Sequence, residues 1–338
     1  MTSSQLHDGQ NHQSNIGALG EEFAVTFERK RLPKFLQSKI VRFGEHDVAM
    51  GYDILSFESS SSLLPDRYIE VKTFRGHPHF YWSENEIAAA RKYAYVFSYF
   101  DTTKEAAGLR LAYSYDGFHW TAINAGKPIL NPTVGKDRLM RDPSICQAPD
   151  GTFHMVWTTS WTDKVIGHAT SRDLIHWSEQ ETIPVMVHEP TTRNSWAPEL
   201  FYEKKTKLFW IFWASTVPGA KEVKTMSKSE SDYNHRIYAC YTKDFKTYSQ
   251  TMLWFNPDFC AIDAAVAQDP KTGELIMAVK NENLVPEEKN IRITRTRSMK
   301  DGFPIQVSEP IHKKGLWCEG PSPIFIGKDL VVYYDNYR

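Results

Sequence analysis

The feature that most constrains this fold is a long repeat in the second part of the chain. Four acidic residues, Asp142, Glu199, Asp263 and Glu319, stand in short motifs that are 57, 64 and 56 residues apart. Each motif precedes a short aromatic or β-branched run of the kind that forms strands. An all-β repeat of this length is typical of β-propeller blades, so we expect a mainly β fold here.

A second series of motifs has a similar spacing. The segment Ser114–Trp120 (SYDGFHW) returns at Ser171–Trp177 (SRDLIHW) and, more loosely, at Thr242–Tyr248 (TKDFKTY). We place this unit in the outer turn and strand of a blade, and we expect Trp120 and Trp177 to serve blade packing. The predicted strands are 95–99, 109–114, 153–158, 208–213, 275–279 and 330–334.

The acidic residues start the innermost strands in this interpretation, so they would converge on one channel. Asp142, Asp263 and Glu319 could then supply the two carboxyl groups that glycoside hydrolysis needs, with one left to orient or tune the others. Glu199 is assigned a structural role. The indole rings of Trp161, Trp196 and Trp317 could form walls on which a sugar ring stacks.

Residues 95–338 resemble glycoside hydrolase family 43, the five-bladed β-propeller arabinosidases and xylosidases. The motifs that carry the resemblance are Asp142–Ile145, Asp173–Trp177, Trp196–Leu200, Ile262–Ala264 and Glu319–Ser322. The resemblance implies an inverting glycosidase acting on arabinofuranosyl or xylosyl linkages of plant-type polysaccharides or oligosaccharides. It implies that Asp142 is the general base, that Asp263 tunes and holds the acid, and that Glu319 is the general acid. Some relatives also carry a structural calcium ion in the channel.

Counting blades gives four before Glu319 and a fifth that begins there. The sequence ends at Arg338, after about two strands of that blade. We therefore expect a propeller whose last blade is incomplete. The alternative is a catalytically inactive propeller that binds carbohydrate.

Residues 15–94 have a different pattern, that of a small α/β domain. Ile16, Leu19, Phe23 and Phe27 recur at helical spacing. Strands are predicted at 51–57 and 67–74, and a second helix begins at Ser83, where Glu86 completes a capping box.

The two predicted strands of this domain carry Asp53, Glu70 and Lys72. Glu70 and Lys72 would share one strand face, and Asp53 could join them. Two carboxylates there, Asp53 and Glu70, could hold Mg²⁺, while the lysine orients or activates water against a phosphodiester.

This segment resembles the C-terminal domain family of the plant protein NO VEIN, which has a restriction-endonuclease-like core. The matching residues are Gly17 with Gly20-Glu21, Gly51–Ile54, Ile69–Lys72 and Phe80–Tyr81 leading to Glu84–Glu86. The resemblance implies a metal-dependent nuclease site, to which Glu21 could add a metal contact. The net charge of −1 over the first 94 residues opposes tight binding of nucleic acid.

Composition excludes several classes of protein. The 338 residues are 41% hydrophobic with a net charge of −1, so the chain is neither disordered nor globally basic. Cys146, Cys240, Cys260 and Cys318 form no CxxC pair, and we expect buried free thiols. Residues 1–14 form a predicted disordered tail without an apolar signal segment, and no stretch could span a membrane. We therefore expect a cytoplasmic protein. The substrate expected from the resemblance is a carbohydrate. The oligomeric state is not predicted. The missing linker between the two domains and the incomplete last blade together suggest a gene fusion, a recombination or an assembly artefact.

Overall fold

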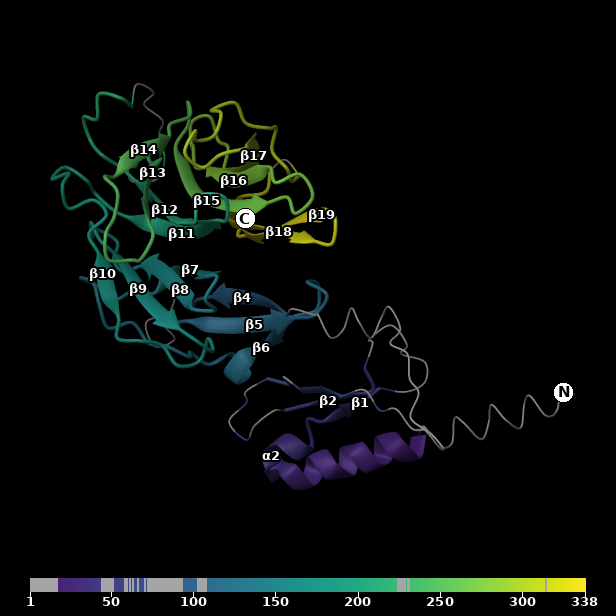
Figure 1. Ribbon diagram of the computed structural model, residues 1–338. Coiled ribbons are helices and arrows are strands. Elements are labelled where there is room, and N and C mark those ends of the chain that lie inside the picture. Colours follow the sequence, from purple (N-terminus) through teal and green to yellow (C-terminus); the bar gives the residue numbers. More distant parts are fainter. Residues whose placement is uncertain are drawn as a thin grey trace, which may run out of the picture. The chain divides into compact units, whose positions relative to one another are not determined.

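The computed structural model divides into two compact units, Met1–Tyr95 and Val96–Arg338 (Figure 1). The predicted tail at 1–14 and the predicted helix from Ser83 lie outside the residues that the structure describes. The described residues are 18–43, 52–57, 60, 62, 64–65, 67–69, 71, 94–101, 108–223, 229, 232–313 and 315–338.

The first unit has the α/β composition expected from its sequence. Residues 18–31 are helical, and a short helix α2 (Lys34–Gln37) follows. Three short strands, β1 (Val41–Arg42), β2 (Ile54–Ser56) and β3 (Arg67–Ile69), form an antiparallel sheet. Strands β2 and β3 lie within the two predicted strand segments. Ile54 is opposite Ile69 in their register.

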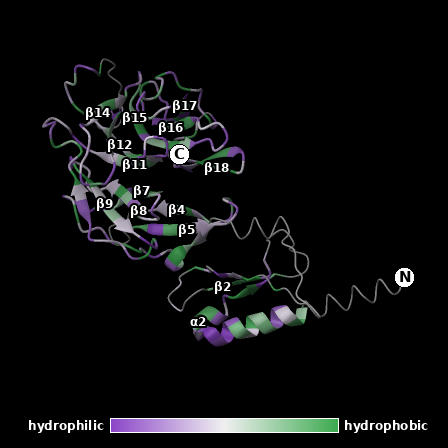
Figure 2. Ribbon diagram, viewed as in Figure 1, coloured by the Kyte–Doolittle hydropathy of each residue, from purple (hydrophilic) through white to green (hydrophobic). Residues whose placement is uncertain are grey.

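The helix at 18–31 buries a different face from the apolar stripe that predicted it. Leu19, Phe23 and Phe27 are exposed by 66, 75 and 54%, whereas Val25 and Glu28 are buried. The buried face is held to the sheet by a polar contact, because the Glu28 carboxylate accepts a hydrogen bond from Ser56 of β2 at 2.7 Å. Hydropathy alternates along this helix in Figure 2. The helix was therefore predicted correctly, but its buried side was not.

The second unit is mainly β, and its described residues form five separate antiparallel sheets. Each sheet follows the order of the chain. The first contains β4 (Tyr95–Tyr99), β5 (Arg110–Ser114) and β6 (Thr121–Ala122); the second contains β7 (Arg141–Gln147), β8 (Phe153–Thr158), β9 (Ile166–Ser171) and β10 (Glu181–Ile183); the third contains β11 (Trp196–Glu203), β12 (Leu208–Ser215), β13 (Arg236–Thr242) and β14 (Met252–Phe255); the fourth contains β15 (Ala261–Gln268), β16 (Leu275–Asn281) and β17 (Asn290–Thr296); the fifth contains β18 (Cys318–Ile326) and β19 (Asp329–Asn336).

All six strands predicted in this unit are present. The segments 95–99 and 153–158 coincide with β4 and β8, while 208–213, 275–279 and 330–334 fall inside the longer strands β12, β16 and β19. The prediction at 109–114 begins one residue before β5. Strand interiors were easier to predict than their ends because the ends are set by pairing with neighbours.

The five sheets contact one another in a closed cycle. The first strands of the last four sheets follow one another, with β7 against β11, β11 against β15 and β15 against β18. Ser98 of β4 donates a hydrogen bond to the carbonyl of Pro143 in β7. Tyr333 of β19 closes the cycle, because its ring contacts Phe97 of β4 and Trp120 before β6.

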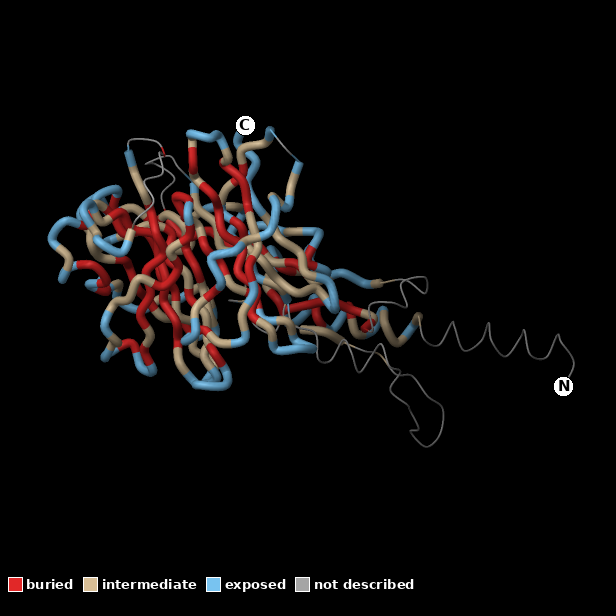
Figure 3. Tube along the Cα trace, turned by 90° about the horizontal axis from the view of Figure 1, so that it is seen from above, coloured by how far each residue is buried: buried red, intermediate tan, exposed pale blue. Residues whose placement is uncertain are grey.

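The hydrophobic core lies between neighbouring sheets. One cluster joins the second and third sheets, and includes Ile166, Trp213 and Phe245. A second cluster, with Trp254 and Met277, joins the third and fourth. Figure 3 shows the buried residues along the strands, and exposed residues at many of the turns.

The four cysteines are all free thiols, as expected. Three of them are buried, and Cys146 is half-buried. Across the parts of both units that the structure describes, the helices are too short or too polar to cross a membrane.

The three repeated segments Ser114–Trp120, Ser171–Trp177 and Thr242–Tyr248 each form the same turn. In the turn after β9, the Asp173 carboxylate accepts hydrogen bonds from the backbone N–H groups of Ile175 and His176. Asp116 and Asp244 accept the corresponding bonds after β5 and β13. This is how a short acidic side chain holds a tight turn.

Candidate active site

Four of the five sheets begin with the same backbone distortion. Strands β7, β11, β15 and β18 each have a shift of register near their start, which is a β-bulge. One residue in each bulge has a left-handed backbone. These residues are Asp142, Ala197, Asp263 and Gly320, with φ of 51°, 46°, 52° and 59°.

The acidic residues of the repeat do not occupy equivalent positions in these bulges. Asp142 and Asp263 are themselves the left-handed residues, whereas Glu319 precedes Gly320 and Glu199 follows two residues after Ala197. Aspartate tolerates this backbone better than most side chains. The element that repeats in the structure is therefore the bulge. The acidic residues that the sequence analysis treated as equivalent stand up to two positions away from the left-handed residue of their bulge.

The bulges place three predicted carboxyl groups on one cavity of about 310 Å³. Asp142 of the second sheet, Asp263 of the fourth and Glu319 of the fifth all line it, and Glu199 does not. The other lining residues are Phe100, Arg141, Thr158, Trp161, Trp196, Ala197, Ser229, Tyr233, His235, Ile262, Lys280, Glu282, Gly320 and Asp335.

Asp142 is held by the neighbouring strand and the neighbouring sheet. Thr158 of β8 donates a hydrogen bond to its carboxylate at 2.9 Å and accepts one from the Ala197 N–H at 2.9 Å. Burial raises the pKa of Asp142, and the Arg141 guanidinium acts in the opposite direction. The threonine thus fixes the orientation of this carboxyl group through contacts on both sides.

Asp263 accepts a hydrogen bond from the Gly320 N–H at 3.1 Å, which links the fourth sheet to the fifth. Burial raises the pKa of Asp263 to about 7. The positive charge of Lys280 acts against burial, while the carboxylates of Asp142 and Glu319 add to the rise. A carboxyl group in this state exchanges its proton near neutral pH.

Glu319 forms an ion pair with Lys280 of β16, with Nζ and Oε2 3.0 Å apart. Its side chain is 42% exposed, whereas that of Lys280 is 3% exposed. Lys280 also pairs with Glu282 at 2.6 Å, and Glu282 in turn pairs with the buried Lys289. The candidate acid therefore ends a chain of alternating charges that starts in the protein interior.

Glu199 has a different environment from the other three acidic residues. It accepts a hydrogen bond from Ser144 of β7 at 2.6 Å, and Ser144 accepts one from the Leu200 N–H. Burial raises the pKa of Glu199 to about 7. These contacts join the first strands of the second and third sheets beside the cavity.

Two of the three predicted tryptophans reach the cavity. Trp161 and Trp196 meet edge to face, with ring centres 5.7 Å apart, and Arg141 lies 4.7 Å over the Trp161 ring. Trp317 does not line the cavity. It is covered by the cations of Lys289 and Arg338 at 5.4 and 4.4 Å.

Sequence reasoning missed several cavity residues. Lys280, Glu282 and Asp335 lie outside the acidic repeat, and Asp335 faces Glu319 across the β18–β19 pair. His235 packs against Trp196 and is deeply buried, which lowers its pKa to about 3. One signal was readable in the sequence: Lys280 follows five apolar residues of a predicted strand, and a buried lysine needs a partner.

The residues proposed for a nuclease-like site are only partly described. Glu21 pairs with Arg42 at 2.8 Å, and the Asp53 carboxylate accepts a hydrogen bond from the Val71 N–H at 2.7 Å. Glu70 and Lys72 lie outside the described residues. The nuclease activity and its Mg²⁺ site therefore stay predictions.

In the described parts of both units, no three His, Cys, Asp or Glu side chains converge in a way that could hold a metal ion. The calcium ion that the resemblance implies for the channel stays a prediction.

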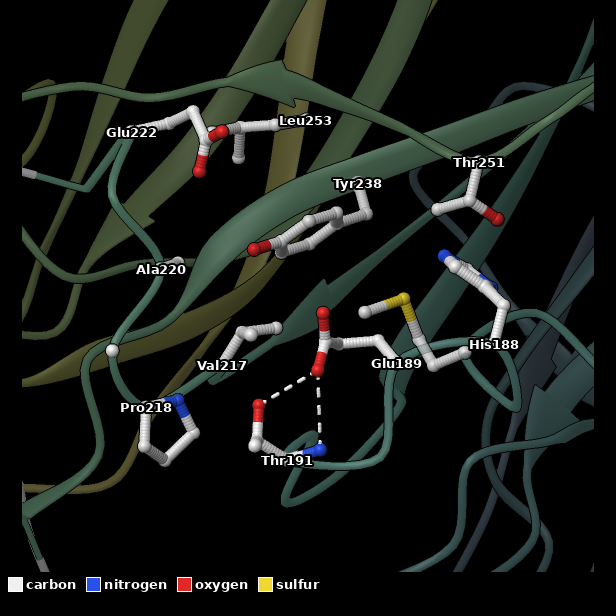
Figure 4. Close-up of a pocket in the computed structure, with 12 residues that line it drawn as sticks. His188, Glu189, Thr191, Val217, Pro218, Ala220, Glu222, Tyr238, Thr251 and Leu253 are labelled. Carbon is white, nitrogen blue, oxygen red and sulfur yellow. Dashed lines mark hydrogen bonds between the residues drawn. The ribbon is translucent and has the colours of Figure 1, made fainter.

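A second cavity, of about 400 Å³, lies between strands β13 and β14 and the segments 186–191 and 217–222 (Figure 4). It contains Glu189, Glu222 and Tyr238, and the Glu189 carboxylate is bound by Thr191. None of the residues predicted for catalysis lines it. We therefore take the three-carboxyl cavity as the candidate active site.

The family model described as "Probable glycosyl hydrolase domain", which is related to glycoside hydrolase family 43, matches residues 91–322. The chain belongs to this family. Residues 20–100 match the model "Protein NO VEIN, C-terminal". No curated protein matches the chain.

Solved structures similar to this family 43-related chain include three glycoside hydrolases. They are the exo-β-1,3-galactanase of Phanerochaete chrysosporium with galactose (15% identity, 64% of this chain and 46% of that one, TM-score 0.44), the arabinanase Arb43A of Bacillus subtilis (13%, 55% and 62%, 0.40) and the α-L-arabinofuranosidase of Lactobacillus brevis (16%, 59% and 63%, 0.42). This chain spans less than two thirds of the length of each.

Proposed function

We propose that the second unit is an inverting glycoside hydrolase that acts on arabinofuranosyl or xylosyl linkages of plant-type polysaccharides or oligosaccharides. The observation that carries this proposal is the cavity itself, where carboxyl groups from three different sheets meet beside two indole rings. We further propose that the five sheets are the blades of one propeller and that this cavity is the mouth of its channel.

We assign the three carboxyl groups the roles that the resemblance implies, and their surroundings support this assignment. Asp142, oriented by Thr158, takes a proton from the attacking water. Glu319, with the longest and most exposed side chain of the three, gives a proton to the oxygen of the leaving group. Asp263 accepts a hydrogen bond from the Gly320 N–H, next to Glu319, and helps to hold this acid in position. One carboxyl group acts as base while the other acts as acid, as inversion requires.

Trp161 and Trp196 form the aromatic surface on which a sugar ring would bind. Trp161 is 48% exposed, packs edge to face on Trp196, and has the Arg141 guanidinium over one side of its ring, so we take the other side of the ring as the surface offered to a ligand. Sugar rings present apolar C–H faces that pack against indole rings. We propose that this pair binds the terminal sugar.

The test is turnover of aryl arabinofuranosides, xylosides and galactosides by the full chain. Glu319→Gln and Asp142→Asn should each lower kcat by roughly 10²–10⁴-fold while the protein stays folded, because each removes one proton transfer. The matched control is Glu222→Gln in the second cavity, which should retain the activity of the wild type.

Binding separates the active enzyme from the alternative of an inactive propeller that binds carbohydrate. Oligosaccharides are titrated against intrinsic tryptophan fluorescence in parallel with the activity assay. Binding without hydrolysis would favour the inactive propeller. Equal turnover by Glu319→Gln, Asp142→Asn and the wild type would rule out the catalytic assignment.

A further inference from the structure

Lys280 is a charged residue in a mostly apolar strand, and it is buried. All seven residues of β16, from Leu275 to Asn281, are buried, and the five before Lys280 are apolar. Burying an ammonium group without partners is costly, so such a lysine persists only where acidic or polar groups compensate it.

The ammonium group of Lys280 has partners from three different segments. Its Nζ lies 3.0 Å from a carboxylate oxygen of Glu319, 2.6 Å from one of Glu282 and 3.1 Å from the Tyr337 hydroxyl. The contacts with Glu319 and Tyr337 are hydrogen bonds, and the contact with Glu282 is an ion pair. If Glu319 turned away, the buried ammonium group would lose one of its two hydrogen bonds and one of its two ion pairs.

Lys280 also acts on the second carboxyl group of the cavity. It is opposite Ile262 in the β15–β16 register, next to the bulge that carries Asp263. Its charge is the strongest influence that opposes the effect of burial on the pKa of Asp263. One cation is thus shared between the candidate acid and the group that tunes it.

We infer that Lys280 is a positioning residue of this site: its ammonium group holds the Glu319 carboxylate in the cavity and places a positive charge beside Asp263. The Glu282–Lys289 pair holds Lys280 in turn, because Glu282 bridges the two lysines. This inference rests on the proposed function only for its kinetic consequence.

Other charged and titratable groups surround Lys280, Glu319 and Asp263. They are Arg141 and Asp142 of β7, Glu199 of β11, His235 before β13, Glu282 after β16, Asp335 of β19 and Tyr337 after it. Lys280 is the one lysine among the described residues of the cavity, so its removal changes the local field more than a surface charge would.

The experiment compares Lys280→Met with Lys280→Arg in the full chain. The protein is labelled with ¹³C at the aspartate carboxyl carbons, and the Asp263 signal is assigned by its loss in Asp263→Asn. In Lys280→Met we expect the pKa of Asp263 to rise from about 7 by roughly one unit or more, because a nearby positive charge is lost. Lys280→Arg should return it toward the wild-type value.

The kinetic arm is the pH profile of kcat/KM. The alkaline limb should move to higher pH in Lys280→Met and stay near the wild-type position in Lys280→Arg. If the wild type is inactive on every glycoside, the proposed function fails, and the carboxyl titration still decides the role of Lys280. An Asp263 signal that titrates at the same pH in Lys280→Met and the wild type would overturn the inference.

Discussion

At the residue scale, the carboxyl groups of the cavity are arranged at the expense of stability. The pKa of Asp263 is about 7 in the folded protein, against an ordinary value of 3.8. Between these pH values the folded protein holds a proton that the unfolded chain has released. Raising the pH through this window therefore lowers the free energy of unfolding.

Replacing Asp263 with asparagine tests this cost. The amide stays neutral at every pH, so Asp263→Asn should be more stable than the wild type at pH 8, by roughly 1–3 kcal/mol, with little gain at pH 4. Thermal and urea unfolding at both pH values measure the difference. A gain of equal size at pH 4 and pH 8 would show that the charge of Asp263 is not its cause.

The sequence predicted the residue types of this site better than their surroundings. Asp142, Asp263 and Glu319 were identified from the repeat, and the structure brings them to one cavity. Lys280 and Asp335 were missed because they meet Glu319 only through the pairing of β18 with β19 and the contact of β16 with β18. Such contacts between distant segments leave no pattern along one chain.

At the scale of elements, close packing inside one sheet depends on the absence of a side chain. Gly167 of β9 is opposite Trp157 of β8, and the indole ring covers the glycine. A Cβ atom at Gly167 would lie 2.0 Å from a ring carbon of Trp157, which is fully buried. The indole ring occupies the space that a methyl group would need.

Gly167→Ala should therefore destabilise the protein by roughly 3 kcal/mol, measured by urea unfolding, because the Trp157 ring has nowhere to move. Trp157→Leu alone should also be costly, since it leaves a cavity. The double variant should lose less than the sum of the two single losses. Strict additivity would contradict a direct clash between these residues.

The sequence predicted helices and strands correctly where a pattern repeats. It did not predict how an element is oriented where polar contacts determine which side is buried. The turns of the three repeated segments and the interiors of the predicted strands follow from local chemistry. The orientation of the helix at 18–31 does not, because the buried Glu28 replaces an apolar contact that the spacing of Leu19, Phe23 and Phe27 had suggested. The bulges were also missed, since the acidic residues that mark them occupy different positions.

At the scale of the whole second unit, the first and fifth sheets meet around Tyr333 of β19. Tyr333 packs on Phe97 and Trp120 with ring centres 5.9 and 5.7 Å apart, and its hydroxyl donates a hydrogen bond to the Gly117 carbonyl. These groups join the first sheet to the fifth. The cavity lies on the same cycle, since Phe100 of the first sheet region and Glu319 of the fifth both line it.

Tyr333→Ala should cost roughly 3 kcal/mol of the free energy of unfolding and lower activity together with it, because the two end sheets separate. Tyr333→Phe should retain most of the stability, since it keeps the ring contacts. The neighbouring Tyr334 is 39% exposed, and Tyr334→Ala should change the stability by less than about 0.5 kcal/mol. Equal losses in Tyr333→Ala and Tyr334→Ala would contradict this account of closure.

The contact between Tyr333 and Gly117 also has a consequence for folding during synthesis. Gly117 and Tyr333 are 216 residues apart, so a ribosome working at about 5–20 residues per second exposes the first sheet for roughly 10–40 s before its last partner emerges. During that interval Phe97 and Trp120 face water or a chaperone, and the nascent chain is open to aggregation. Because pairing across such a sequence separation is slow, we expect the docking of β19 on the first sheet to limit the folding rate of the second unit.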